Sequence, residues 1–423
     1  MSAHLETVRS VFKKWVFIDD DDVIDLVLAS VVANRFKDEP IWIFIVAPPA
    51  NLKTEILLSL AGLPETHLLS KLTPKTLLSG FGKPEHSLLI RLQKEGKSVL
   101  LMKDFTTILE MEESSRKEIF AQLREVADGH MTYSTGGAAG DVHWKGHMGL
   151  LAGVTDVIDH QRLVKNSLGS RFLYYRLGII DQKQAAIAAE NNVGKREAWR
   201  GELSAAVKKF FSEFVLPSSI RDISVPPEIL EKIISFAMFT ARCRTDVDRD
   251  GYQRIVEILP TPEGPSRLAR QFSVLARSIA AVRGKREAGE EELGIIRKLA
   301  FGTISKKRVS VISALYARAS EETLSTREIA VEINLPVNTT KELLEDLSLL
   351  EIIHRQIEDY GGEDGSAKDA TRAYLWRLDF KFREEVKKLN VWPDPVAGGN
   401  HRGDHALAAA GEGRQAVQEE IPF

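Results

Sequence analysis

Three short apolar runs recur about 50 residues apart in the first part of the chain, and helical patterns fill the intervals between them. The runs are Ile41–Val46, Ser98–Met102 and Gly149–Val154, and the first of them follows the helical spacing of Asp22–Phe36. Each run is rich in strand-favouring residues and is shorter than an ordinary helix. Strands that alternate with helices predict an α/β fold with a parallel sheet.

The pattern changes further along the chain. From Asp181 to Leu299 only helical periodicity remains, which predicts an all-α region, and a compact unit of helices and a hairpin follows it. The last residues are rich in Gly, Ala and Pro and show no period, which predicts a disordered tail. We therefore expect an N-terminal extension at 1–18, an α/β core at 19–182, a helical region at 183–300, a second unit at 301–385 and the tail at 386–423.

Composition excludes several classes of protein. Apolar residues make up 43% and charged residues 28%, the balance of a soluble globular chain. The longest apolar run, Ile41–Ala50, contains two prolines and is too short to cross a membrane, and the N-terminus lacks the apolar stretch of a signal peptide. The single cysteine, Cys243, rules out an internal disulfide and fits a reducing cytosol. We expect a cytoplasmic protein without a membrane partner.

The segment between the first strand and the next apolar helix has the spacing of a phosphate-binding loop, G-x-x-x-x-G-K-[ST]. Its lysine and its hydroxyl residue are present, and they would supply a charge to the phosphates and a ligand to Mg²⁺. Ala and Leu stand where Gly is usual, at an expected cost of about 1–2 kcal/mol for each residue forced to positive φ. The predicted nucleotide-binding residues are Ala47, Pro48, Pro49, Ala50, Asn51, Leu52, Lys53 and Thr54.

The second strand ends in an acid about 50 residues after Lys53, where an ATPase places the carboxylates that hold Mg²⁺ and activate water. At this point the chain resembles minichromosome maintenance helicases of the AAA+ class. Their I-D-E-F-D-K-M corresponds here to the residues from Met102 to Ile108. In one register Lys103 replaces the metal-binding acid and Asp104 takes the place of the catalytic acid. In the other register Asp104 is the metal ligand and Phe105 replaces the catalytic acid, so one of the two acids is missing either way.

The resemblance continues to about Arg283. It implies a polar sensor at Thr155, an arginine at Arg171 that reaches a neighbouring subunit's nucleotide, and a second sensor at Arg267 in a helical lid. It also implies ATP and Mg²⁺ as cofactors, the metal held by Thr54 and Asp104, and a homo-oligomeric, hexameric ring.

A hairpin-like stretch precedes the third strand, and in the family this hairpin grips DNA. The tip lacks the family's basic residues, but His143, Trp144 and Lys145 on the return strand would contact a nucleic-acid strand by stacking and charge. An inward-facing Trp144 is the alternative interpretation. Because the net charge is only −3, nucleic-acid binding has to use such local groups.

Residues from Leu324 to Arg355 resemble a winged helix-turn-helix. Ser325 and Glu328 form a capping box, and Asn338 is expected to cap a second helix. On that helix Asn338, Thr339 and Lys341 are the predicted DNA contacts. The acids Glu342, Glu345 and Asp346 on the same helix favour docking to protein instead, because phosphates would repel them.

The chain ends in a sequence that resembles the acidic tip of bacterial single-stranded DNA-binding proteins. The predicted partners are host replication proteins that read such tips, and the predicted contacts are Glu419, Glu420, Ile421, Pro422 and Phe423.

Two hypotheses follow. In the first, the chain is an AAA+ motor or loader, helicase-like, that acts on DNA during replication of a mobile element. In the second, it is a hydrolysis-deficient nucleotide-binding regulator or scaffold that recruits host replication proteins. Leu52 and Lys103 discriminate between them, because both residues weaken a hydrolytic site.

Overall fold

The computed structural model describes residues 3–49, 52–78, 87–134, 141–160, 171–178, 181–250, 254–256, 258–359 and 372–389. Its centre is a five-stranded sheet in the order β2-β3-β6-β1-β7, and every neighbouring pair in it is parallel. The predicted α/β fold is confirmed. The strands are β1 (Trp42–Val46), β2 (Thr66–Leu69), β3 (Val99–Met102), β6 (Gly149–Val154) and β7 (Phe172–Arg176).

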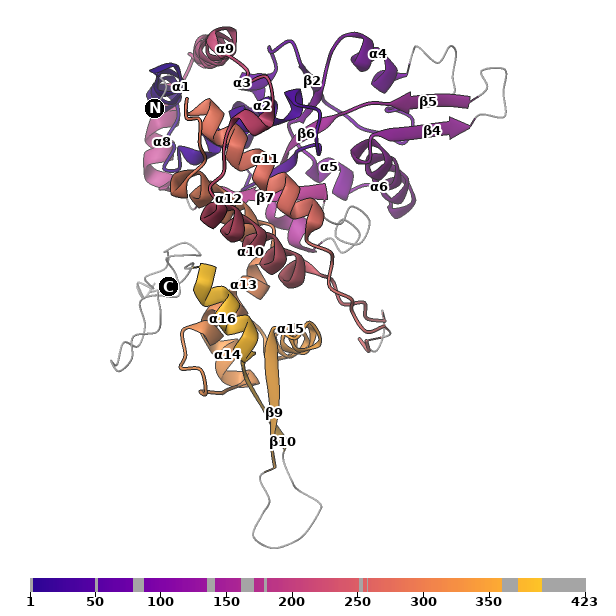
Figure 1. The fold of residues 1–423 in the computed structure, drawn as a ribbon, viewed down its shortest axis with the longest axis vertical. Helices are drawn as coiled ribbons and strands as arrows, with labels where there is room; N and C mark the ends of the chain where they lie inside the picture. The colour runs from indigo at the N-terminus through magenta and orange to yellow at the C-terminus, as the bar shows by residue number, and fades with distance from the viewer. Residues whose placement is uncertain are drawn as a thin grey trace, which may run out of the picture.

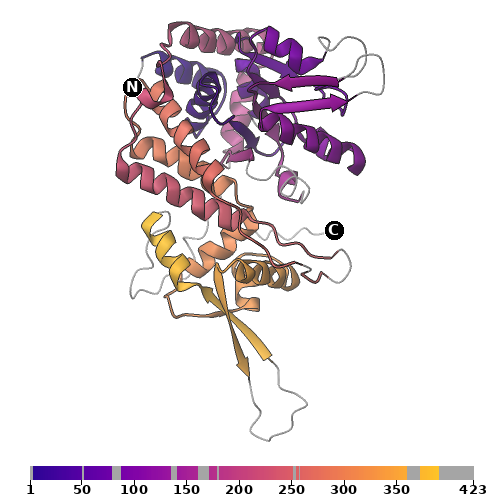
Figure 2. The same cartoon turned by 45° about the vertical axis from the view of Figure 1, so that its right-hand side comes forward.

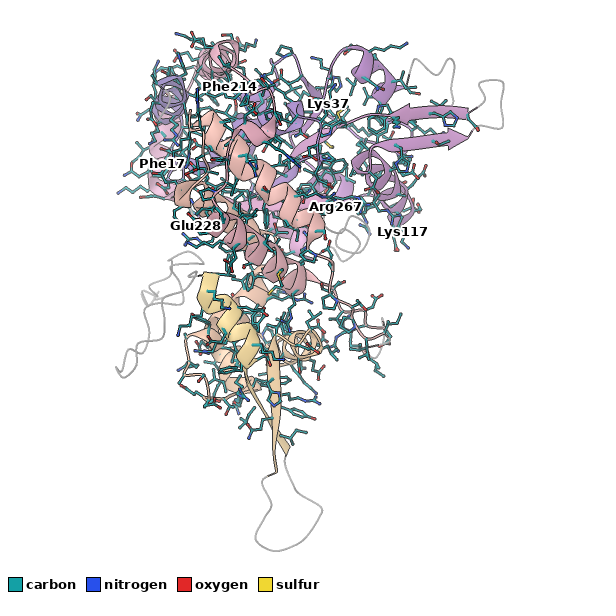
Figure 3. All side chains as sticks on the ribbon, viewed as in Figure 1. Phe17, Lys37, Lys117, Phe214, Glu228 and Arg267 are labelled. Carbon is teal, nitrogen blue, oxygen red and sulfur yellow. The ribbon has the colours of Figure 1, made fainter. Side chains whose placement is uncertain are left out.

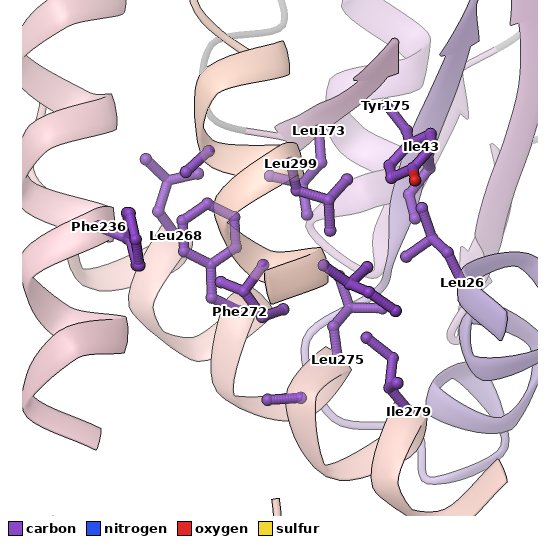
Figure 4. Close-up of a cluster of buried hydrophobic side chains, with 14 of the residues drawn as sticks. Leu26, Ile43, Leu173, Tyr175, Phe236, Leu268, Phe272, Leu275, Ile279 and Leu299 are labelled. Carbon is purple, nitrogen blue, oxygen red and sulfur yellow. The ribbon is translucent and has the colours of Figure 1, made fainter. Parts of the chain in front are cut away.

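The central strands are apolar along their whole length because the sheet is covered on both faces. Along β1, Ile43 and Ile45 belong to one buried cluster, whereas Trp42, Phe44 and Val46 belong to another. The period of two along a strand thus divides one continuous apolar run between two cores. Figure 4 shows the first core, in which side chains of the sheet meet those of α2 (Asp22–Arg35), α11 (Ser266–Val282) and α12 (Glu290–Gly302).

The second core lies under α4 (Leu88–Lys94), α5 (Thr106–Leu109) and α6 (Glu113–Ala127). The antiparallel pair β4 (His130–Ser134) and β5 (Asp141–Lys145) also packs on this core and projects from the body of the molecule (Figure 1). The predicted hairpin is therefore present, and its tip at 135–140 lies outside the described residues.

The predicted helical region is also observed. It contains α8 (Gln182–Asn191), α9 (Arg196–Glu213) and α10 (Pro227–Arg244), followed by α11 and α12. These helices share the first core with the sheet: α11 packs against α2, α12 against β7, and α9 against α3 (Lys53–Leu60) and α1 (Ala3–Trp15). In Figures 1 and 2, α10 and α11 lie between the sheet and the C-terminal unit.

The C-terminal unit combines helices with a small antiparallel sheet in the order β8-β10-β9. Its elements are α13 (Lys306–Tyr316), β8 (Leu324–Ser325), α14 (Thr326–Glu332), α15 (Val337–Leu349), β9 (Ile353–Asp359), β10 (Arg372–Leu378) and α16 (Phe380–Leu389). The capping box of Ser325 and Glu328 is confirmed, with hydrogen bonds of 3.2 and 2.7 Å. The expected cap at Asn338 is wrong: α15 begins at Val337, because Pro336 takes the N-cap position and its carbonyl accepts the Thr340 N–H at 2.9 Å.

Among the described residues, no helix is both long and apolar enough to cross a membrane. The tail was predicted to begin at 386, but α16 continues to Leu389 and buries Val386 and Leu389, so that boundary is wrong. From position 390 onward the predicted tail lies outside the described residues.

A partly buried histidine makes part of the stability depend on pH. The His147 Nε2 lies 2.9 Å from the Oδ1 atom of Asn34, a fully buried residue of α2. Burial lowers the pKa of His147 from 6.5 to about 4, although a hydrogen bond to the backbone of Asp38 partly offsets this effect. Because the folded state favours neutral imidazole, the unfolded chain takes up the proton first as the pH falls.

This contribution to stability is therefore complete above pH 6.5 and is lost as the pH decreases from 6.5 to about 4. We expect a His147→Gln variant to lose less stability than the wild type over this window, by an amount of the order of 2 kcal/mol. Urea denaturation of both proteins at the two ends of the window measures the difference. Equal acid sensitivity in the two proteins would contradict the assignment.

Candidate functional site

A cavity of about 880 Å³ lies at the carboxyl edge of the parallel sheet, beyond the ends of β1, β3 and β6. The chain leaves β1 toward β2 and leaves β6 toward β7, in opposite directions along the sheet. Open α/β sheets bind ligands at such a change of direction. The cavity is lined by Pro48, Pro49, Leu52, Lys53, Thr54, Glu55, Lys103, Asp104, Thr106, Glu110, Thr155, Asp156, Val157 and Arg196.

The predicted phosphate loop lies between β1 and α3, and Lys53 and Thr54 begin the helix. Lys53 is only 7% exposed, and its ammonium donates hydrogen bonds to the carbonyl oxygens of Ala47 and Pro48, the latter at 2.8 Å. Burial lowers the pKa of Lys53, and the carboxylates of Asp104 and Asp156 partly offset that effect. A charged amine at a helix N-terminus, facing a cavity, is suited to bind an anion.

The left-handed conformation expected where Gly is usual is not found in the described part of the loop. None of Ala47, Pro48, Pro49 or Leu52 has φ in the left-handed region, and Leu52 has a φ of 2°. Leu52 lies instead in the wall of the cavity. Ala50 and Asn51 are outside the described residues, so their predicted role is not tested.

The end of β3 brings Lys103 and Asp104 to the cavity, as the sequence predicted. The Asp104 Oδ1 accepts the Thr106 N–H at 2.9 Å, and Thr106 in turn lies 3.4 Å from the Thr155 hydroxyl, oxygen to oxygen. Phe105 is fully buried and its ring centroid lies 4.7 Å from that of Phe44. In both registers a single carboxylate therefore occupies this strand end.

Gly153 of β6 allows these segments to approach closely. A Cβ atom at this position would lie 2.6 Å from the Lys103 carbonyl oxygen and 3.4 Å from the Lys53 Cβ. The Gly153 carbonyl also accepts the Phe105 N–H at 2.7 Å. The absence of a side chain at Gly153 thus lets the β3 end and the first turn of α3 meet beside one cavity.

The charge balance of the cavity depends on groups outside it. Glu55 accepts hydrogen bonds from two nitrogens of Arg200, Nε and Nη2, at 2.8 and 2.5 Å, and Asp156 is paired with Lys306 at 3.0 Å. Within the part of the chain that the structure describes, no ion pair is formed by Lys103. Two of the lining acids are therefore neutralised from outside, whereas Lys53 and Lys103 face the cavity.

A second pocket of about 440 Å³ adjoins the first and shares Leu52, Glu55 and Arg196 with it. Its other walls come from α8, α9 and the end of α1, and they are mostly apolar: Trp15, Val16, Phe17, Ala185, Ala188, Ala189, Asn192, Val193, Gly194 and Trp199. We did not predict this pocket from the sequence. The concentration of aromatic residues at Trp15–Phe17 was the available signal, but no motif connects it to α8 or α9.

The two predicted arginines lie together, but not in the cavity. Arg171 and Arg267 both pair with Asp128, at 2.6 and 3.0 Å, and Arg267 also pairs with Glu39 at 3.0 Å. Arg171 precedes β7 and Glu39 precedes β1, so this cluster lies at the amino edge of the sheet, opposite the cavity. In Figure 3, Arg267 lies well apart from Phe17, which lines the second pocket.

The hairpin residues have different exposures. His143 and Lys145 are exposed on β5, whereas Trp144 is 3% exposed and belongs to the second core. The prediction that Trp144 stacks on a nucleic acid is therefore wrong. The alternation along the strand turns Trp144 toward the sheet and its two neighbours toward solvent.

The predicted contacts on α15 are accessible: Asn338 and Lys341 are exposed, and Thr339 is half-buried. The acids of the helix lie beside these residues, and Lys341 approaches Glu345 to 3.9 Å. Glu342 pairs with Arg254 at 2.7 Å, and Arg249 pairs with Glu345 and Asp346 at 3.1 and 2.8 Å. The three acids of α15 are thus held by the segment that follows α10, and DNA contact by Asn338, Thr339 and Lys341 is not tested. The predicted tip, Glu419–Phe423, lies outside the described residues.

No protein-family model matches the chain, and no curated protein matches it in sequence. Among solved structures, the chain is similar to a protein from Cytophaga hutchinsonii that is provisionally described as an ATPase. The identity is 10% and the TM-score 0.42, and the match covers 71% of this chain and 86% of that chain. No statement about activity follows from a likeness this distant.

Proposed function

We propose that the chain binds a nucleoside triphosphate, with its phosphates at Lys53 and Thr54 and its base in the adjoining aromatic pocket. The observation that carries the proposal is the buried Lys53 at the first turn of α3, after the loop that leaves the parallel strand β1, beside a cavity lined by charged and hydroxyl-bearing side chains. The two adjoining pockets match the two halves of a nucleotide. One offers charged and hydroxyl groups, and the other offers apolar and aromatic walls.

We propose more specifically that the chain is an AAA+-like nucleotide-binding regulator. The single carboxylate at the end of β3 supports slow hydrolysis, because phosphoryl transfer normally needs acids both for the metal and for the water. The buried Trp144 removes one of the groups expected of a DNA motor or loader. ATP turnover measured with and without single-stranded DNA separates the two functions. Rapid turnover that DNA stimulates would favour the motor.

The binding test uses the tryptophans of the second pocket as probes. Trp15 and Trp199 line the pocket proposed for the base, so ATP should change their fluorescence in a saturable manner, with a midpoint in the micromolar range. Inorganic triphosphate should compete with ATP and cause a smaller change, since it lacks the base. A titration without any saturable signal, and without heat in calorimetry, would contradict the proposal.

We also propose that Arg171 acts on the cavity of a neighbouring copy in a homo-oligomeric ring. The observation behind it is the position of Arg171 at the amino edge of its own sheet, about 16 Å of strand length from the carboxyl edge. An Arg171→Ala variant should therefore bind ATP as the wild type does but lose self-association that depends on nucleotide. Sedimentation with a non-hydrolysable ATP analogue measures this. A wild type that stays monomeric at micromolar concentration would contradict the ring.

A further inference from the structure

Lys103, directly after β3, lies where a nucleotide-binding site would place its metal. Lys103 and Asp104 both line the cavity beside Lys53 and Thr54. Arg196, at the first turn of α9, lines the same cavity, and its guanidinium approaches Glu55 to 4.0 Å. Three cationic side chains thus surround the space proposed for the phosphates.

The available donors do not fit Mg²⁺ well. The candidate donors to a metal are the Asp104 and Glu110 carboxylates and the Thr54 hydroxyl, and one Asp104 oxygen already accepts the Thr106 N–H at 2.9 Å. Glu55 and Asp156 are engaged by Arg200 and Lys306. Among the described residues, no group of three or more His, Cys, Asp or Glu side chains is placed to hold a metal ion. Mg²⁺ requires near-octahedral oxygen ligands, and a neighbouring ammonium repels it.

The same groups are suited to an anion without a metal. A triphosphate carries several negative charges, and in metal-dependent sites Mg²⁺ neutralises part of this charge between the terminal phosphates. An ammonium is a compact point charge with three donors, so Lys103 beside Lys53 provides both charge and hydrogen bonds to phosphate oxygens. Because no ion pair holds Lys103 in the described part of the chain, its charge is available to a ligand.

We propose that this cavity binds nucleoside triphosphates free of Mg²⁺, with Lys103 supplying the charge that the metal supplies elsewhere. The inference rests on the proposed function, since it concerns the same cavity. It defines the ligand as the uncomplexed nucleotide, and it makes the chain a sensor of nucleotide and not a metal-dependent hydrolase.

The test is an ATP titration in excess EDTA and again in excess Mg²⁺, on the wild type and on three variants. The wild type should bind ATP in EDTA with a Kd within about threefold of its value in Mg²⁺. Lys103→Met should raise the Kd in EDTA by about tenfold or more, and Lys103→Arg should restore most of the affinity. Lys117→Met is the matched control, because Lys117 pairs with Glu113 on the exposed surface of α6 and does not line the cavity.

The outcomes are distinguishable. Binding only in Mg²⁺, or a Lys103→Met variant with unchanged affinity in EDTA, would overturn the metal-free proposal and leave the proposed function intact. Absence of ATP binding under both conditions would overturn the proposed function itself. Circular dichroism of each variant establishes that it is folded, so a loss of affinity is not mistaken for unfolding.

Discussion

A Lys53→Met variant should lose nucleotide binding, with affinity reduced by about 100-fold or more. Lys53 is buried in the first turn of α3, and its ammonium donates hydrogen bonds to the carbonyl oxygens of Ala47 and Pro48 in the preceding loop. When phosphate oxygens replace those carbonyls as acceptors, the interaction becomes charge-assisted on both sides and correspondingly strong. Methionine has a similar length and is apolar, so it fills the buried site without the charge.

The tryptophan fluorescence titration and calorimetry both measure this loss. Lys117→Met again controls for the removal of a lysine, and the unfolding midpoint of Lys53→Met shows whether the fold is retained. Removing a buried cation that lacks a carboxylate partner should not lower that midpoint greatly. If wild type and Lys53→Met bind ATP equally, the phosphate site is wrongly placed.

An Asp25→Ala variant should be destabilised by about 3–5 kcal/mol, the largest effect on stability that we expect. Asp25 is fully buried in α2, and its carboxylate pairs with Arg9 of α1 at 2.6 Å and with Arg283 after α11 at 2.6 Å. Arg283 also pairs with the fully buried Glu292 of α12 at 3.0 Å. Removing the Asp25 carboxylate deprives the guanidinium groups of Arg9 and Arg283 of a negatively charged partner in the protein interior.

Guanidinium chloride denaturation of the wild type and the variant gives the change in unfolding free energy. Asp25→Asn should lose less, since the amide oxygen still accepts one of the hydrogen bonds. Glu113→Ala, which removes an exposed ion pair with Lys117, should leave the midpoint unchanged. The prediction fails if the unfolding midpoint of Asp25→Ala is as close to the wild-type midpoint as that of Glu113→Ala. In that case the ion pairs of Asp25 with Arg9 and Arg283 do not stabilise the packing of the helices.

The local features of this protein follow from its sequence. The apolar run at Ile41–Val46 indicated a buried strand, and β1, whose side chains enter two cores, confirms it. Lys53 was expected at a strand-to-helix turn, and Ser325 with Glu328 at a helix start, and both are there. These features depend on periods of two or 3.6 residues and on caps, which involve only neighbours in the chain.

The tertiary structure decided which distant groups meet. Trp15 and Trp199 line the same pocket, and Arg171 and Arg267 pair with the same carboxylate, that of Asp128. These residues are far apart in the sequence, so no local sequence pattern predicts their contacts. The sequence indicated that side chains alternate along β5. It did not indicate which of the two faces packs on the core, and in the structure Trp144 is on the buried face. Local preferences fix the elements, whereas the order of strands and the packing of helices fix the site, because only they place residues far apart in the chain beside one cavity.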